Sequence, residues 1–405
     1  MNNPRRPMAP VPARVDGVRQ RNAASVVKEI LLNGPIARAE IAGRMGLSQG
    51  AVAKITAELI NASIVVEAAR SAATTMDPTL GRPRIPLALN REKHRFLGVH
   101  IGLDKLQIGL VDLTGVIVRD RAIAHRHRGP EAVLRQARQE VTKLLAAEDG
   151  VVVGAGVCAA GWVDPSTQTL VEHKGLGWKD VALPLAIPPE LLVPIAVDST
   201  VRALAIAEAL FGVGRDTHDL LFVFIGSVIG SAHSVGGSIH RGRRAAAGTI
   251  DHLPVAGRGV ACVCGGRNCL AALTNDAAVA AQAREAGLIG TDDKYEKLVE
   301  LVRGPSPTPA ALALMNRRAR LVGSAVAILS DLFAPDVMAL GGGILDGPDG
   351  VEQVRLGAEA TGPGTSGLTQ VIRGSALGVQ APMRGAASLA LDAFIDNPLG
   401  TRLAS

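Results

Sequence analysis

Residues 96–124, FLGVHIGLDKLQIGLVDLTGVIVRDRAIA, decide the fold of the larger part of this chain. The stretch contains three apolar, β-type runs separated by turn signals at Leu103-Asp104 and Thr114-Gly115. A helix is expected near residues 130–147, and strands, glycine turns and helices continue to alternate downstream. This alternation predicts an α/β body with two glycine-rich halves.

The composition is that of a folded protein with two or three domains. The chain has 405 residues, of which 47% are hydrophobic and 20% are charged, values that are typical of globular rather than disordered chains. It contains no apolar run of transmembrane length, and its basic, proline-containing start, MNNPRRPMAPVPARVDG, lacks the apolar core of a signal peptide. We therefore expect a cytoplasmic protein with no membrane partner.

Basic charge is concentrated at the N-terminal end. Residues 1–95 contain 15 Lys plus Arg against 7 Asp plus Glu, a net charge of +8, whereas the rest of the chain has a net charge of −2. A basic domain joined to a nearly neutral body indicates a polyanion as partner, although a solvated surface would have a similar composition.

The N-terminal segment has the pattern of a helix-turn-helix. Turn signals at Asn33-Gly34-Pro35 and Gly46-Leu47-Ser48 separate three predicted helices, and Ser48 can cap the third. Two helices joined by a short glycine-containing turn are typical of a DNA-binding unit whose second helix enters the major groove. The apolar positions that define the three helices are Ala24, Val27, Ile30 and Leu31, then Ile36, Ile41 and Met45, then Val52, Ile55, Leu59 and Ile60.

The start of the third helix is the expected reading surface for DNA. Gln49 has an amide that suits a base edge, and Lys54 suits a phosphate. A three-helix protein-interaction module is the alternative. The predicted contacts from this helix are Ser48, Gln49, Gly50, Ala53 and Lys54.

Residues 63–90, SIVVEAARSAATTMDPTLGRPRIPLALN, predict a wing. Two β-rich runs flank a Ser/Thr/Gly/Pro loop. Within the loop, Gly81-Arg82-Pro83-Arg84 places Arg82 and Arg84 in an extended pair that suits a narrow, A·T-rich minor groove. A basic linker is the alternative interpretation.

Residues 246–272, AAGTIDHLPVAGRGVACVCGGRNCLAA, contain three of the four cysteines. His252, Cys262, Cys264 and Cys269 fall within 18 positions, and zinc prefers four nitrogen and sulfur ligands in a tetrahedral arrangement. A tight cysteine cluster in a reducing compartment more often binds metal than forms disulfides. The alternatives are free or redox-active thiols, or an iron–sulfur cluster, which usually needs four cysteines.

The order of these segments along the chain resembles that of the ROK family, which unites bacterial repressors of sugar-responsive genes with sugar kinases. The resemblance covers about residues 20–390. It implies a two-lobed, actin-like fold of the ribonuclease H type, structural zinc on the four ligands named above, and a cleft that in the family's kinases holds ATP and sugar. The matching segments are FLGVHIG, GWVDP, LGWKDV, VDSTVRALAIAEALFG, FIGSVIG, AAGTIDH, CVCGGRNCL and ALGGGI.

The resemblance also implies the domain boundaries. We expect a winged helix-turn-helix domain over residues 1–90 and a first α/β lobe over residues 96–200. The second α/β lobe, which contains the zinc loop, is expected over residues 201–390. The C-terminal helix is expected to return to the first lobe.

The two phosphate loops depart from the kinase pattern. The family's Asp-Ile-Gly-Gly-Thr-Lys is His100-Ile101-Gly102-Leu103-Asp104-Lys105 here, and its Gly-Thr-Gly-Ile-Gly is Gly226-Ser227-Val228-Ile229-Gly230. The first change removes a carboxylate and a hydroxyl that phosphoryl transfer uses, and the second places a β-branched residue where phosphates approach closely. We therefore expect ATP binding to be lost or feeble and the protein not to be an enzyme.

The sugar-binding positions are also altered. Relatives that bind a hexose have Asn, Asp, Glu, His and Glu where this chain has Val197, Asp198, Thr249, His252 and Ala271. Each lost polar partner costs about 1–3 kcal/mol of binding free energy, so an unmodified hexose is disfavoured. Four basic residues nearby either suit a charged ligand or are simply solvated: Arg241, Arg243, Arg244 and Arg258. The candidate effector-binding residues are Asp198, Thr249, Asp251 and His252.

These features together predict a transcription regulator, a repressor of carbohydrate-related or secondary-metabolism genes. It is expected to bind a palindromic, A·T-rich operator in double-stranded DNA as a homodimer or homotetramer, with a sugar or sugar derivative as candidate effector. Two alternatives stay open: an active sugar kinase with a DNA-binding arm, and a DNA-binding protein without an effector.

Overall fold

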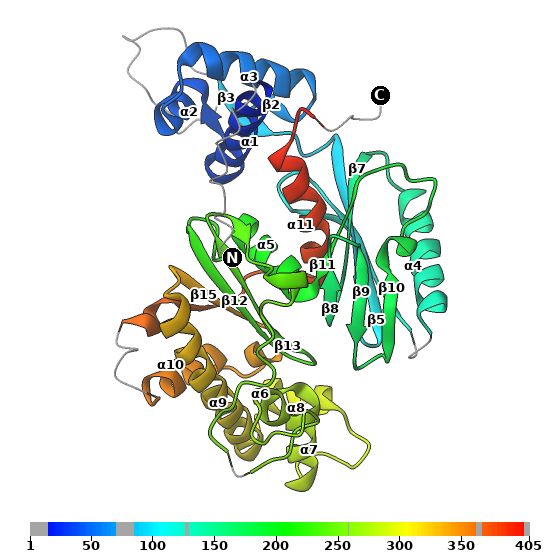
Figure 1. The fold of residues 1–405 in the computed structure, drawn as a ribbon, viewed down its shortest axis with the longest axis vertical. Helices are drawn as coiled ribbons and strands as arrows, with labels where there is room; N and C mark the ends of the chain where they lie inside the picture. The colour runs from blue at the N-terminus through cyan, green and yellow to red at the C-terminus, as the bar shows by residue number, and fades with distance from the viewer. Residues whose placement is uncertain (1–14, 70–84, 126–128, 258, 362–366, 401–405) are drawn as a thin grey trace, which may run out of the picture.

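The computed structural model describes residues 15–69, 85–125, 129–257, 259–361 and 367–400. A small N-terminal head sits above two α/β lobes (Figure 1). Within these described ranges, no helix is both long and apolar enough to cross a membrane.

The head is a three-helix unit with a small sheet. Its elements are α1 (Val15–Asn33), α2 (Arg38–Met45), α3 (Gln49–Asn61) and a sheet of order β1-β3-β2, formed by β1 (Ile36–Ala37), β2 (Val65–Glu67) and β3 (Pro86–Leu89). The turn before α3 begins at Gly46, whose φ of 64° favours glycine. The Ser48 side chain then accepts a hydrogen bond from the Ala51 N–H at 3.2 Å. The predicted turn and cap are therefore present.

The first lobe is built on a five-stranded mixed sheet of order β11-β7-β4-β5-β6. The three strands predicted within residues 96–124 form its antiparallel part, and β4, β7 and β11 run parallel. A second, three-stranded sheet has the order β10-β9-β8. The elements are β4 (His94–Ile101), β5 (Lys105–Val111), β6 (Ile117–Ala124), α4 (Pro130–Leu145), β7 (Val151–Ala159), β8 (Trp162–Asp164), β9 (Thr169–His173), β10 (Trp178–Ala182), η1 (Leu183–Ala186) and β11 (Ile195–Ser199).

The second lobe repeats this plan with a sheet of order β14-β13-β12-β15-β16. Its strands are β12 (Asp219–Ile225), β13 (Ile229–Val235), β14 (Ser238–Ile239), β15 (Val337–Gly341) and β16 (Ile372–Gly374). Its helices are η2 (Arg243–Ala245), α6 (Leu270–Thr274), α7 (Asp276–Glu285), α8 (Tyr295–Arg303), α9 (Pro309–Phe333), η3 (Gly343–Leu345), α10 (Gly350–Glu359) and η5 (Leu368–Val371).

Two helices, α5 (Thr200–Phe211) and α11 (Ala381–Asp396), pack against each other beside the first sheet. Helix α11 crosses strands β4 and β7 so closely that a Cβ on Gly98 would lie 2.4 Å from the Met383 carbonyl oxygen. A Cβ on Gly156 would lie 1.7 Å from the Ala386 carbonyl oxygen. Glycine at both positions allows the C-terminal helix to lie directly on the sheet of the first lobe.

The head shares a hydrophobic core with the body. Val27 and Ile30 of α1 belong to the same buried cluster as Leu391 and Phe394 of α11. Polar contacts flank this core: Lys28 forms an ion pair with Asp396 at 2.8 Å. The guanidinium of Arg215 donates a hydrogen bond to the Leu31 carbonyl oxygen at 2.8 Å. The position of the head is therefore coupled to α11.

Candidate functional site

The first site is the exposed end of α3. Four of the residues predicted to contact DNA are exposed there: Gln49, Gly50, Ala53 and Lys54. The Ser48 hydroxyl already accepts the capping hydrogen bond, so its side chain holds the start of the helix. A shallow depression of about 460 Å³ adjoins this end of the helix and is lined by Ala37, Arg38, Ala39, Gln49, Gly50, Ala53 and Ile85.

Arg38 is a residue of this face that the sequence analysis did not single out. Its Nε donates a hydrogen bond to Thr56 Oγ1 and its Nη2 donates one to Glu67 Oε1, each at 3.1 Å. Arg38 thus joins α2, α3 and strand β2, and fixes α3 relative to the small sheet. The predicted wing residues Arg82 and Arg84 lie outside the described residues.

The second site is the cysteine-rich loop, where the four predicted ligands come together. The ligand atoms of His252, Cys262, Cys264 and Cys269 all lie within 4.8 Å of one another. Cys262 Sγ is 3.5 Å from His252 Nδ1, and Cys264 Sγ is 3.5 Å from Cys269 Sγ. Thiolates bound to one tetrahedral zinc are separated by about 3.7 Å, so the donor set and its spacing fit this ion.

Asp251 lies behind this cluster. Its Oδ2 is 3.2 Å from His252 Nε2, while His252 Nδ1 faces the cysteines. A metal-binding histidine commonly donates its second N–H to a carboxylate, which fixes the tautomer and the orientation of the ring. Asp251, predicted as an effector-binding residue, thus has the geometry of a support for His252.

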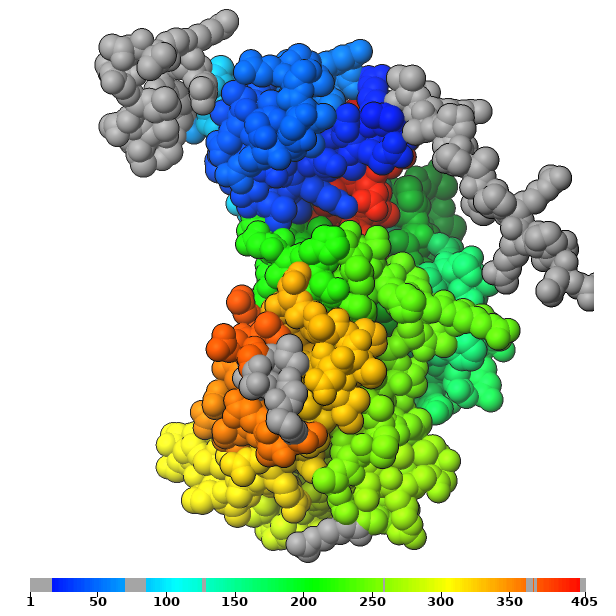
Figure 2. Space-filling model, turned by 60° about the vertical axis from the view of Figure 1, so that its left-hand side comes forward, coloured from blue at the N-terminus to red at the C-terminus, as the bar shows by residue number. Residues whose placement is uncertain are grey.

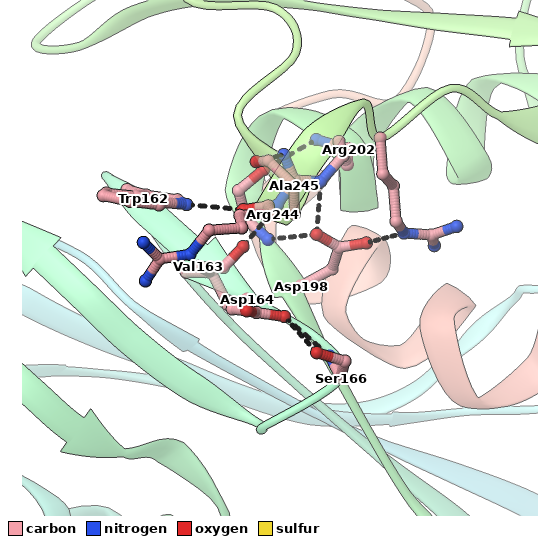
Figure 3. Close-up of polar contacts among 10 residues, drawn as sticks. Trp162, Val163, Asp164, Ser166, Asp198, Arg202, Arg244 and Ala245 are labelled. Carbon is pink, nitrogen blue, oxygen red and sulfur yellow. Dashed lines mark hydrogen bonds and ion pairs between the residues drawn. The ribbon is translucent and has the colours of Figure 1, made fainter. Parts of the chain in front are cut away.

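The third site surrounds Asp198, at the end of β11 where α5 begins (Figure 3). Asp198 is fully buried. Its Oδ1 accepts hydrogen bonds from the Ser199 N–H at 2.8 Å and from Arg202 Nε. Its Oδ2 accepts one from Arg241 Nε at 3.0 Å. Two donors therefore face Oδ1 and one faces Oδ2, so the carboxylate is held by side chains and backbone of the chain itself.

Arg202 is the centre of this network and is only 4% exposed. In addition to Asp198, it donates hydrogen bonds to the carbonyl oxygens of Val163 at 2.7 Å and of Ala245 at 3.0 Å. Val163 belongs to the first lobe and Ala245 to the second, so this side chain joins the two lobes. The sequence offered one signal for the residue: an arginine four positions after an aspartate, at the start of a helix.

The segment around η2 completes the contact between the lobes. Trp162 Nε1 donates a hydrogen bond to the Arg244 carbonyl oxygen at 2.8 Å, and the Arg244 guanidinium lies over the indole ring, 5.1 Å from its centroid. Arg243 and Arg244 are exposed. Thr249 is also exposed, and its hydroxyl donates to the Ala246 carbonyl oxygen at 3.1 Å. Arg258 lies outside the described residues.

Two buried polar side chains lie beside glycine-rich segments of the chain. His100 is buried at the end of β4, where the first predicted phosphate loop begins. Near Gly343, Arg318 is 2% exposed and donates hydrogen bonds to the Thr274 carbonyl oxygen at 2.7 Å, to Asp276 Oδ1 at 2.6 Å and to the Tyr295 hydroxyl at 2.6 Å. Sequence analysis did not identify Arg318, because a single arginine within a helical pattern is normally solvated.

The sequence profile of the ROK family matches residues 96–393, which is most of the chain. The chain belongs to the ROK family. The predicted family and the two-lobed, actin-like α/β fold are therefore confirmed. The four-residue cluster is a group that could hold a metal ion, as expected from the sequence.

Curated ROK relatives align along nearly the whole chain. The transcriptional regulator Rv0485 of Mycobacterium tuberculosis is 30% identical over 391 residues, covering 93% of this chain and 86% of the relative. The xylose repressor of Bacillus subtilis is 24% identical over 386 residues, covering 94% of this chain and 97% of the relative.

Solved structures include both regulators and kinases. A ROK family transcriptional regulator, a homologue of the Escherichia coli Mlc protein, superposes with a TM-score of 0.76 at 25% identity and covers 94% of this chain and 98% of its own. A ROK family glucokinase from Streptomyces griseus, in complex with glucose and AMPPNP, superposes with a TM-score of 0.62 at 25% identity. The glucokinase match covers 74% of this chain and 99% of the glucokinase chain.

The substitution of a carboxylate by His100 in this ROK chain has a consequence for pH dependence. Burial, together with the nearby Lys105 ammonium, lowers the pKa of His100 from 6.5 to about 3. As the pH falls below 6.5, the unfolded chain therefore takes up a proton at this position before the folded chain does. Neutral His100 contributes fully to the free energy of unfolding above pH 6.5. This contribution is lost progressively as the pH falls from 6.5 to about 3.

Replacing His100 with glutamine should reduce this loss. Between about pH 6 and pH 5, the free energy of unfolding of His100→Gln should fall by about 1 kcal/mol less than that of the wild type. Urea denaturation at both pH values measures the difference. Equal losses in the two proteins would show that His100 is not the neutral buried group described here.

Proposed function

We propose that this chain is a DNA-binding transcription regulator that acts as a repressor of carbohydrate-related or secondary-metabolism genes. The observation that carries the proposal is the exposed, capped helix α3 in a three-helix head with a small sheet. Relatives named as regulators and repressors match along nearly the whole chain and support this function. The basic charge of residues 1–95 suits the DNA backbone.

The contacts to DNA follow from exposure and chemistry. Gln49 reads a base edge, Lys54 contacts a phosphate, and Ser48 and Gly50 shape the start of the helix. Arg82 and Arg84 enter the minor groove of an A·T-rich site. A homodimer or homotetramer binds two half-sites about one helical turn apart, or a multiple of that spacing. The protein acts in the cytoplasm.

Zinc is the metal we propose for the cluster. His252, Cys262, Cys264 and Cys269 would hold it as a closed structural site, with no position left for a substrate. When bound, the ion supplies cross-linking and folding free energy rather than catalysis. Apart from two isolated β-bridges, the described residues between Ile250 and Leu270 form no helix or strand, which supports a need for such a link.

The region around Asp198 holds the proposed effector site, with Thr249, Asp251 and His252 on the neighbouring loop. Because Arg202 and Arg241 already pair with Asp198, an unmodified hexose that binds this carboxylate competes with an ion pair whose Arg202 and Asp198 side chains are buried. Removing one partner of such a pair costs about 3–5 kcal/mol. The same contacts argue against sugar phosphorylation, and we propose that the chain is not an enzyme. They also favour a second candidate function, a DNA-binding protein that responds to no effector.

A route from this region to the head runs through two packed helices. Arg202 lies on α5, α5 packs along α11, and α11 packs against α1 of the head. A ligand that moves α5 relative to the first sheet would therefore shift the head. Such a ligand regulates DNA binding only if it binds the two arrangements with different affinities.

Alanine variants of the reading helix test the DNA interface. On operator fragments selected from genomic DNA, Gln49→Ala should lower affinity about tenfold and relax specificity at one base pair. Lys54→Ala should weaken binding to all DNA sequences alike. It should also reduce the slope of log affinity against log salt concentration by about one. Quantitative gel-shift titrations at several salt concentrations measure both effects. Unchanged affinity in both variants would contradict the proposed interface.

An Asp251 variant tests the metal centre. Asp251→Ala should lower zinc affinity about tenfold to a hundredfold, because His252 loses the partner that orients its ring. Thr249→Ala, two positions away on the same loop, is the matched control and should retain wild-type affinity. Competition with a chromophoric chelator measures zinc affinity in the purified proteins. Wild-type zinc affinity in Asp251→Ala would contradict the supporting role, and wild-type protein without zinc would contradict the metal itself.

A further inference from the structure

The depression of about 460 Å³ beside the start of α3 has a mostly apolar lining. The head that contains it forms one end of the molecule (Figure 2), and α3 lies on the outer side of the head (Figure 1). The depression is therefore part of the surface that a DNA duplex would approach. Its apolar lining consists of Ala37, Ala39, Gly50, Ala53 and Ile85.

The polar residues at the edge of the depression leave this lining uncovered. Arg38 Nε donates a hydrogen bond to Thr56 Oγ1 and its Nη2 donates one to Glu67 Oε1, so the guanidinium is directed toward α3 and β2. Gln49 is exposed at the edge. Ile85 is 42% exposed, and an apolar side chain of this size gains free energy when a partner covers it. The depression thus offers apolar contact beside one amide.

Gly50 leaves space in the depression that the fold itself does not need. A Cβ at this position would have no described atom within 4 Å, and its φ lies outside the left-handed region that favours glycine. Within a helix, glycine is also less stable than alanine. Neither packing nor backbone geometry within the described chain therefore explains a glycine here, whereas a partner that enters the depression does.

The chemistry of the lining selects one group of the DNA duplex. Among the groups that base pairs present in the major groove, the thymine 5-methyl group is the apolar one. Phosphate and sugar oxygens instead favour charged or hydrogen-bonding side chains. Adenine presents N7 and its N6 amino group in the same groove, and the Gln49 amide can bond to both. The depression and Gln49 together fit an A·T-rich step.

We infer that the depression receives the 5-methyl group of a thymine in the operator, and that Gly50 and Ala53 select thymine by leaving room for it. The inference deepens the proposed DNA-binding function and rests on it. The two fail differently in experiment. A protein that binds its operator but does not distinguish thymine from uracil contradicts only this inference, whereas a protein that binds no DNA contradicts the proposed function as well.

Single thymine-to-uracil substitutions in the operator test the contact with the full-length protein. Each substitution removes one methyl group and leaves base pairing and the backbone unchanged. At one position of each half-site, the affinity of the wild type should fall about fourfold, the loss expected when one methyl-sized group is no longer buried. The other thymines should be indifferent to the change. Quantitative gel-shift titrations measure each operator.

Gly50→Ala is the matched protein variant, because its added methyl group takes the space proposed for the thymine methyl. It should bind the thymine operator less tightly than the wild type does, and uracil at the sensitive position should no longer lower its affinity. Gly43→Ala is the control, since Gly43 is also an exposed helical glycine with open space but does not line the depression. It should retain the wild-type preference for thymine.

Two results would overturn the inference directly: equal wild-type affinity for the thymine and uracil operators, or an unchanged preference for thymine in Gly50→Ala. A third comparison replaces single phosphates of the operator with neutral methylphosphonates. If Gly50→Ala alters only the response to these linkages, the depression receives the DNA backbone and the inference is wrong.

Discussion

A single buried carboxylate, Asp198, organises the contact between the two lobes. Its oxygens accept hydrogen bonds from Arg202 and Arg241, and Arg202 extends to backbone carbonyls on both sides of the interface. Buried charges are tolerated only when they are paired and their remaining hydrogen-bonding groups are satisfied, which is the case for Arg202. The interface therefore depends on all of these partners being present together, and a ligand that needs the carboxylate must compete with them.

The same constraint explains how the body is connected to the head. Helix α5 begins at the residue after Ser199, so the Asp198 network fixes its N-terminal end. Helix α11 lies between α5 and the first sheet, where Gly98 and Gly156 leave room for its backbone. Its far end contributes Leu391 and Phe394 to the core of the head. The ROK body thus holds the head in place through a shared, packed core.

Local features of the sequence predicted local structure well. The glycine before Ser48 and the serine cap follow from backbone geometry and side-chain chemistry within a few residues, and the four metal-binding candidates lie in one loop. The phosphate-loop substitutions were also visible, because each occurs within a short motif. The family resemblance supplied the two-lobed arrangement, which periodicity alone does not determine.

Features that depend on distant residues were missed. Arg241 reaches Asp198 across 43 positions of the chain, and Arg318 reaches Gly343 from the middle of a long helix. No local pattern separates these arginines from solvated ones. Asp251 stays a predicted effector-binding residue, and the sequence did not indicate that its carboxylate faces the His252 ring. The direction of a side chain within an irregular loop depends on tertiary packing. The spacing of residues along the sequence therefore does not predict it.

We expect this ROK chain to bind DNA and to perform no sugar chemistry at Asp198, whose carboxylate lies in an internal ion-pair network. Operator affinity and sugar phosphorylation, measured together while a panel of unmodified hexoses and ATP is added, test it most directly. Operator affinity should stay unchanged within about twofold, which is a coupling free energy close to zero, and no sugar phosphate should form. Release of the operator by an unmodified hexose, or turnover at ordinary kinase rates, would contradict it.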